Sequence, residues 1–163
     1  MRCAKQYEAK LLGTRYLIIY REHNNMIKHL EISFGEENYQ HLTGIELIDS
    51  FGNTKQHVSR LFFKKCLTNK LSIKEIKLKK DGTTNLKLAA LPVLLDLHKI
   101  TKIAGSYNNS RQYLIADKIV GNTNFCLGLK YYSHSKFFVP SSAILEDINN
   151  PRTSFGHLYK ISK

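Results

Sequence analysis

Two β-rich segments joined by a short polar turn constrain the fold of this chain more than any other feature. The segment Arg15–Arg21 (RYLIIYR) is rich in residues that favour strands. The segment Met26–Phe34 (MIKHLEISF) alternates between two faces, as a half-buried strand does. Between them, His23-Asn24-Asn25 favours a turn. The pattern predicts a β-hairpin and therefore a fold that contains an antiparallel sheet.

Helical spacing of apolar residues occurs on both sides of this hairpin. Glycine, serine and proline residues mark where several of these helices should begin, end or bend. The predicted helices are Cys3–Leu12, which Gly13 ends, Lys55–Leu67, a short helix that Ser72 caps with Glu75, Leu86–Leu97, which Pro92 should break or kink, and Ala143–Ile148, which Ser142 caps.

From Lys99 onward the sequence favours strands separated by loops, at a spacing that suits an antiparallel sheet rather than βαβ units. Together with the helices this predicts an α+β protein. Its 163 residues suit a single domain, 1–163. The predicted strands of this part are Lys99–Ala104, Tyr113–Ala116, Phe125–Tyr132, Lys136–Val139 and His157–Ile161.

The chain is strongly basic, with 25 Lys and Arg against 13 Asp and Glu. The excess is not a tail, because residues 1–82 and 83–163 each carry +6. Distributed positive charge favours nucleic acid or another polyanion as partner. The alternative is a basic protein without such a partner.

The three cysteines are far apart and unpaired in sequence, which argues against a disulfide framework or a zinc site. They are expected to be buried in a protein of the reducing cytoplasm. The start of the chain has no long apolar run, and its longest apolar stretch is too short for a bilayer. We therefore expect no signal peptide and no membrane partner.

The segment Tyr39–Ile45 (YQHLTGI) carries the clearest chemical pattern. If it is a strand, His41 and Thr43 point to the same face because they are two residues apart. A histidine can exchange a proton near neutral pH and so act as general acid or base. Thr43 can bind a phosphate oxygen, and Gly44 allows a tight backbone path. The alternatives are a structural histidine in a turn and a hydroxyl bonded to backbone.

Five segments occur along the chain in an ordered series: His41–Ile45, Leu61–Leu67, Asp81–Lys87, Asp117–Gly121, and Val139–Ser142 followed by Glu146-Asp147. Together they resemble the phage-associated Barnase–EndoU–colicin E5/D–RelE-like nuclease family, fourth group. The resemblance implies N-terminal helices packed on a curved antiparallel β-sheet. It also implies metal-independent RNA cleavage, often by a toxin of a phage or mobile element. RNA (tRNA or other cellular RNA) would then be the substrate, with no cofactor and with an acidic immunity or antitoxin protein as a possible partner.

RNA cleavage without a metal needs a base for the 2′-OH, cations for the phosphorane and an acid for the departing 5′-oxygen. His41 is the first candidate for acid or base. Lys87, among apolar neighbours, can reach phosphate or extend from the edge of the core to solvent. Ser141 and Ser142 follow Pro140, where a helix N-terminus would offer a phosphate seat. The alternative for Ser142 is simple capping.

Three further residues are candidates for substrate binding. Arg21 belongs to the hairpin and can reach the face of His41 if the two adjoin. Lys118 can bind phosphate, although an ion pair with Asp117 in a turn is the alternative. Tyr132 can stack on a base; the alternative is that its ring simply packs within the sheet.

The basic run of Lys74, Lys77, Lys79 and Lys80 can contact the RNA backbone or simply be solvated. The histidines lack metal-binding spacing, so no metal is expected. Two other functions remain open: a nucleic-acid-binding protein of a mobile element without catalysis, and an interaction protein whose charge serves solubility.

Overall fold

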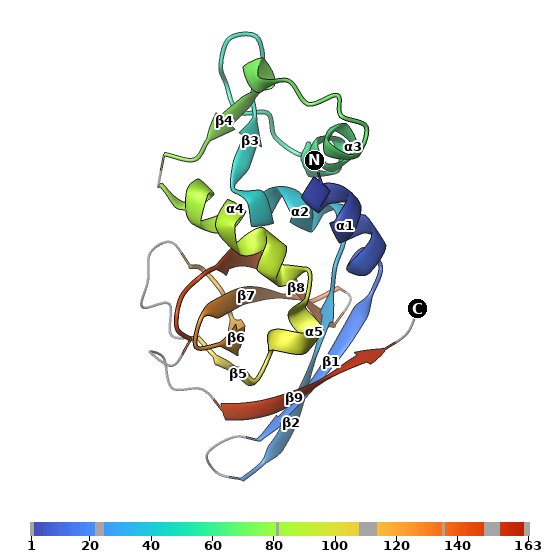
Figure 1. Ribbon diagram of the computed structural model, residues 1–163, viewed down its shortest axis with the longest axis vertical. Coiled ribbons are helices and arrows are strands. Elements are labelled where there is room, and N and C mark those ends of the chain that lie inside the picture. Colours follow the sequence, from blue (N-terminus) through green and yellow to red (C-terminus); the bar gives the residue numbers. More distant parts are fainter. Residues whose placement is uncertain are drawn as a thin grey trace.

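The computed structural model describes residues 2–21, 25–80, 82–107, 114–134 and 136–148, and the backbone of 154–161. Most helices gather at one end of the molecule and most strands at the other (Figure 1). This confirms the α+β class and the packing of N-terminal helices on a curved, mostly antiparallel sheet. The helices are α1 (Arg2–Lys10), α2 (Glu36–Thr43), α3 (Ser59–Leu67), α4 (Thr83–Leu94), α5 (Leu97–Ile100) and the 3₁₀ helix η1 (Ile73–Glu75).

The strands form one closed sheet in the order β1-β2-β8-β7-β6-β5-β9, and a small separate sheet of β3 and β4. The strand pairs of the closed sheet are antiparallel except β2 and β8, which meet in parallel at Ile32 and Phe138. The strands are β1 (Arg15–Arg21), β2 (Ile27–Ser33), β3 (Ile45–Leu47), β4 (Ile76–Leu78), β5 (Ile103–Ser106), β6 (Lys118–Asn122), β7 (Phe125–Tyr132), β8 (Phe137–Ile144) and β9 (Ser154–Ile161).

The predicted hairpin is confirmed as β1 and β2, which pair from Arg15 with Ser33 to Arg21 with Ile27. The two turn residues predicted at 23 and 24 lie outside the described residues. Tyr16 and Ile18 are buried while their neighbours are more exposed, because alternate residues of a strand face opposite sides. The hairpin therefore gives one face to the core.

Aromatic side chains join the helices into the main core. The ring of Tyr7 on α1 lies 5.1 Å from that of Tyr39 on α2 and 5.6 Å from that of Phe63 on α3, both edge-on. All three are buried. Edge-on aromatic pairs add to the free energy gained by burial, so this cluster holds α2 in a defined place. No described helix combines the length and apolar character that a membrane-spanning helix needs.

The segment Tyr39–Thr43 is a helix, so the strand predicted there is wrong. Two acidic residues lie in the first turn of α2, where they favour the positive end of the helix dipole. The Asn38 side chain accepts a hydrogen bond from the Gly35 N–H at 2.7 Å and so supports the start of the helix. Tyr39 and Leu42, three residues apart, are both buried. These local helix signals outweigh the β-like composition of the segment.

The helix predicted to begin after Ser142 is also wrong, because β8 continues to Ile144. Its residues pair with β7: Ser142 with Gly128 and Ile144 with Cys126. A register shift opposite Gly128 makes Ser141 the extra residue of a bulge. Neither serine therefore stands at a helix N-terminus.

Other boundaries moved by smaller amounts. Helix α3 begins at Ser59 rather than Lys55, and α4 runs through Pro92 without a break. Because Pro92 lies in the last turn, it removes a hydrogen bond only near the end of the helix. The strand predicted at Lys99–Ala104 begins later, as β5, because α5 occupies the residues before it. Residues 114–116 do not form the predicted strand, and β6 begins at Lys118 instead; Tyr113 lies outside the described residues.

Candidate active site

His41 lies in the last turn of α2, and Gly44 ends this helix. The Gly44 N–H donates a hydrogen bond of 3.1 Å to the carbonyl oxygen of Gln40, with the glycine in the left-handed region at φ +67°. Glycine adopts this conformation without the steric cost that a side chain brings. The chain can therefore turn sharply, one turn after His41, into β3.

Gly44 also lets Lys87 of α4 approach the end of α2. A Cβ at position 44 would lie 3.0 Å from Cδ of Lys87 and 3.2 Å from Cα of Thr84. The space that a side chain would fill is thus taken by the lysine stem and the α4 backbone. Lys87 is only 5% exposed. Because Gly44 has no side chain, the buried Lys87 can pack next to the end of the helix that carries His41.

Thr84 joins three segments at this point. Its hydroxyl donates a hydrogen bond of 2.8 Å to the carbonyl oxygen of Gly44 and accepts one of 3.1 Å from the Lys79 N–H. The first bond is buried and spans 40 residues of sequence. The end of α2, the start of α4 and the chain that leaves β4 are therefore held together by one side chain.

The surroundings of His41 favour the neutral form of its imidazole. Partial desolvation is the largest cause that holds the His41 pKa below its ordinary value near 6.5, and the cations Lys79 and Lys87 lower it further. Glu37, one helical turn earlier, acts in the opposite direction. A neutral imidazole at pH 7 can accept a proton, and two nearby ammonium groups can stabilise an anion.

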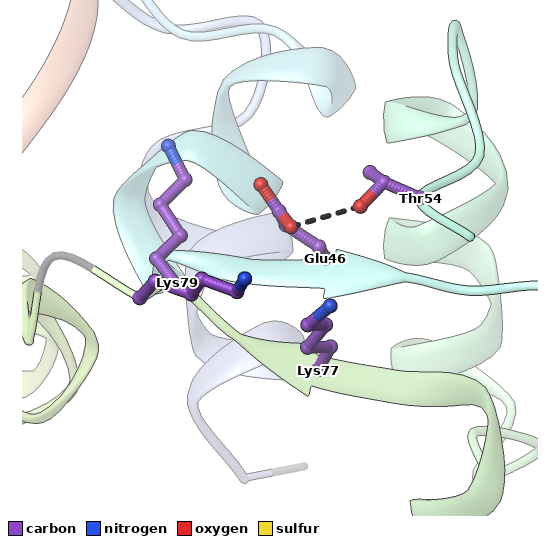
Figure 2. A pocket seen from close by; sticks show the side chains of 5 residues that line it. Glu46, Thr54, Lys77 and Lys79 are labelled. Atoms are coloured by element: carbon purple, nitrogen blue, oxygen red, sulfur yellow. Dashed lines mark hydrogen bonds between the residues drawn. The ribbon is translucent and has the colours of Figure 1, made fainter. Parts of the chain in front are cut away.

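An open groove of about 370 Å³ adjoins these residues. It is lined by Glu46 of β3, Lys77 of β4, and Thr54, Lys79 and Lys80 from the adjoining loops. Figure 2 shows Glu46 and Thr54 turned toward each other; the Thr54 hydroxyl donates to Oε2 of Glu46 at 3.1 Å. Lys79 both lines the groove and acts on His41. Lys79 is thus the residue that links the groove to the histidine.

Thr43 does not share a face with His41, as the strand prediction required, because two residues in a helix lie about 200° apart around the axis. Its hydroxyl donates to the Gln40 carbonyl at 2.8 Å and accepts from the Ile45 N–H at 3.2 Å. Thr43 is also buried. The structure therefore agrees with the alternative for Thr43, a hydroxyl that is hydrogen-bonded to the backbone.

Ser141 and Ser142 lie on β8, a strand that packs against both α2 and α4. The Ser141 hydroxyl donates to the Ile115 carbonyl at 3.2 Å. Ile144 packs in a second core cluster with Leu114. Because alternate residues of a strand share a face, Ser142 points to the same side as Ile144. Ser142 is buried, and its hydroxyl has no hydrogen-bond partner among the described residues. The roles predicted for both serines stay predictions, and the structure groups them with the 114–116 segment.

The other predicted substrate-binding residues occupy separate places. Arg21 is exposed at the tip of the β1–β2 hairpin, which extends away from α2 (Figure 1). The Lys118 ammonium donates to the Ser106 hydroxyl at 2.7 Å, in place of the ion pair considered from the sequence. Tyr132 is 54% exposed at the end of β7, its ring 5.7 Å from that of His134. Their roles stay predictions.

Sequence reasoning missed three members of the cluster: Glu37, Lys79 and Thr84. Glu37 would have been found had the helix been recognised, because it precedes His41 by four residues. Lys79 belongs to the basic run predicted to contact the RNA backbone or be solvated, without a link to His41, and Thr84 belongs to one of the family-like segments. In the described ranges, no three side chains of the His, Cys, Asp or Glu type gather in a way that would hold a metal ion.

Comparison with curated proteins returned no match, and neither did comparison with solved structures. One family model matches residues 1–161, nearly the whole chain. Its description is phage-Barnase-EndoU-ColicinE5/D-RelE like nuclease4. The match agrees with the ordered segments recognised in the sequence and with the observed α+β fold. The chain belongs to this family of nucleases.

Proposed function

We propose that this nuclease is a metal-independent endoribonuclease whose chemistry is centred on His41. The observation that carries the proposal is the placement of an imidazole with a lowered pKa beside the cations Lys79 and Lys87. A base and adjoining positive charge are two of the three elements that RNA cleavage by its own 2′-OH requires. The basic groove next to them supports a polyanionic substrate.

In the proposed reaction, neutral His41 takes the proton of the 2′-OH. The 2′-oxygen then attacks phosphorus, a bond forms between them, and the bond from phosphorus to the 5′-oxygen breaks. Lys87 and Lys79 stabilise the negative charge on the phosphorane, and an ammonium group or water supplies the proton that the 5′-oxygen needs. The products are a 2′,3′-cyclic phosphate and a free 5′-hydroxyl.

The test is incubation of the purified protein with a panel of transcripts in EDTA, followed by denaturing gels and analysis of the ends. The proposal expects cyclic phosphate ends, no cleavage of DNA of the same sequence, and a loss of about 10²–10⁴-fold in rate for His41→Ala. His98→Ala is the matched control, an exposed histidine on α5. Binding of RNA without any turnover would instead favour a nucleic-acid-binding protein without catalysis.

We further propose that the enzyme acts on cellular RNA in the cytoplasm as a toxin of a phage or mobile element. The family description and the net charge of +12 support this proposal. Such a toxin would need an inhibitor, and a small acidic protein would complement its charge. Induced expression should stop growth, while the His41→Ala variant should not. Equal growth of both strains would contradict the toxin role.

A further inference from the structure

The groove over the β3–β4 sheet carries more positive charge than the fold itself uses. Lys77 and Lys80 are exposed, and Lys79 is half-buried. Within the part of the chain that the structure describes, no ion pair joins any of these three lysines to a carboxylate. The acid of the adjoining 3₁₀ helix, Glu75, is already paired with Lys65 at 2.6 Å. The three ammonium groups therefore remain available to an anionic ligand.

The one carboxylate in the lining of this groove is held in place. Glu46 stands opposite Lys77 in the register of the two strands. The Thr54 hydroxyl binds its Oε2 at 3.1 Å, whereas Oε1 accepts no hydrogen bond from any described residue. An ionised carboxylate is only an acceptor, so its free oxygen can accept a hydrogen bond from a donor group of a ligand. A nucleic acid brings both phosphates for the lysines and base amino groups for the carboxylate.

We propose that the β3–β4 groove binds the single-stranded RNA next to the cleaved phosphate, and that Glu46 reads an amino group of one base. The proposal rests on the ribonuclease function proposed above. Lys77 and Lys80 contact successive backbone phosphates, and Lys79 connects the groove to His41. A carboxylate that accepts from an exocyclic amino group, such as N4 of cytosine, is an established mode of base recognition. Uracil has no such group, so the groove should discriminate against it.

The phosphate contacts are tested by binding of 2′-O-methyl RNA, which has no 2′-OH and cannot be cleaved. In the Lys77→Ala/Lys80→Ala variant, affinity near 0.1 M salt should fall about tenfold or more. The salt dependence should become shallower by about 1.4 in the log–log slope, because each single-strand phosphate contact contributes about 0.7. The matched control is Lys70→Ala/Lys74→Ala, two exposed lysines that do not line the groove. Unchanged affinity and slope in the first variant would overturn the proposal.

Base reading is tested with Glu46→Gln, which keeps the size of the side chain and an oxygen for Thr54. The amide offers a donor where the carboxylate accepts. The natural protein should bind an oligonucleotide that carries amino-bearing bases at least about tenfold more tightly than oligouridine, and the variant should lose this preference. Equal affinities in the natural protein would overturn the assignment of Glu46.

These binding experiments separate the groove from the chemistry. If the protein binds uncleavable RNA through Lys77 and Lys80 but never cleaves RNA, the proposed RNA-binding groove is supported and the ribonuclease function is refuted. If the protein cleaves RNA but binds it equally well without these lysines, the ribonuclease function is supported and the proposed role of the groove is refuted.

Discussion

The hydroxyl of Thr84 donates a buried hydrogen bond of 2.8 Å to the carbonyl oxygen of Gly44, 40 residues earlier in the chain. This bond joins the end of the helix that carries His41 to the start of the helix that carries Lys87. The same hydroxyl accepts from the backbone of Lys79. One small side chain thus positions the three groups on which the proposed chemistry depends.

Replacement of Thr84 by valine should weaken both stability and activity. The change keeps the shape of the side chain but leaves a buried carbonyl and a backbone N–H without their partner, at a cost of about 1–3 kcal/mol in the free energy of unfolding. Denaturant unfolding and single-turnover cleavage measure the two effects. Thr68→Val is the control, because the Thr68 hydroxyl also donates to a backbone carbonyl, that of Lys64, but is exposed. Equal destabilisation by the two changes would contradict a special role for Thr84.

Replacement of Gly44 by alanine should destabilise the protein for two separable reasons. The left-handed backbone costs an alanine about 1–2 kcal/mol, and its Cβ would press on Lys87 at 3.0 Å and on the α4 backbone at 3.2 Å. Gly52→Ala isolates the first reason, because Gly52 has φ +82° and nothing within 4 Å of its Cβ position. Thermal unfolding should show a larger loss for Gly44→Ala. Equal losses would mean that the close approach of Lys87 has no energetic consequence.

The pH dependence of cleavage should report the charges around His41. If neutral His41 is the base, kcat/KM rises with pH through a pKa below 6.5 and is level at neutral pH. Lys79→Met removes a cation that lowers this pKa, so the acidic limb should move to higher pH. Glu37→Gln removes an anion that raises it, so the limb should move to lower pH. NMR titration of the imidazole gives the same shifts directly, and shifts in one common direction would refute the assignment.

Replacement of Lys87 by methionine should separate catalysis from stability. The variant keeps an unbranched side chain in a buried position but removes the cation next to His41. The rate of single-turnover cleavage should fall about 10²–10³-fold, as expected for loss of one group that stabilises the transition state. Folding should persist, which circular dichroism can check. A folded variant with full activity would exclude Lys87 from the chemistry.

The sequence alone was enough for the elements whose patterns are local. The hairpin of β1 and β2, strand β7 and helix α1 were all predicted, because alternation or helical spacing over a few residues reflects which face is buried. The strand predicted around His41 and the helix predicted after Ser142 were wrong. In the first case a helix start near Gly35 was overlooked, and in the second pairing with β7 decided the conformation.

The candidate site depends on both levels of information. The sequence identified His41 as the first candidate base and Lys87 as a possible phosphate contact, from chemical type and family resemblance. Only the tertiary structure brought Lys79 and Lys87 near His41 and put Arg21 at the tip of the β1–β2 hairpin. The physical reason is that a residue's charge is a local property, whereas its neighbours depend on how α2, α4 and β4 pack. That packing is set here by Thr84 and by the missing side chain of Gly44.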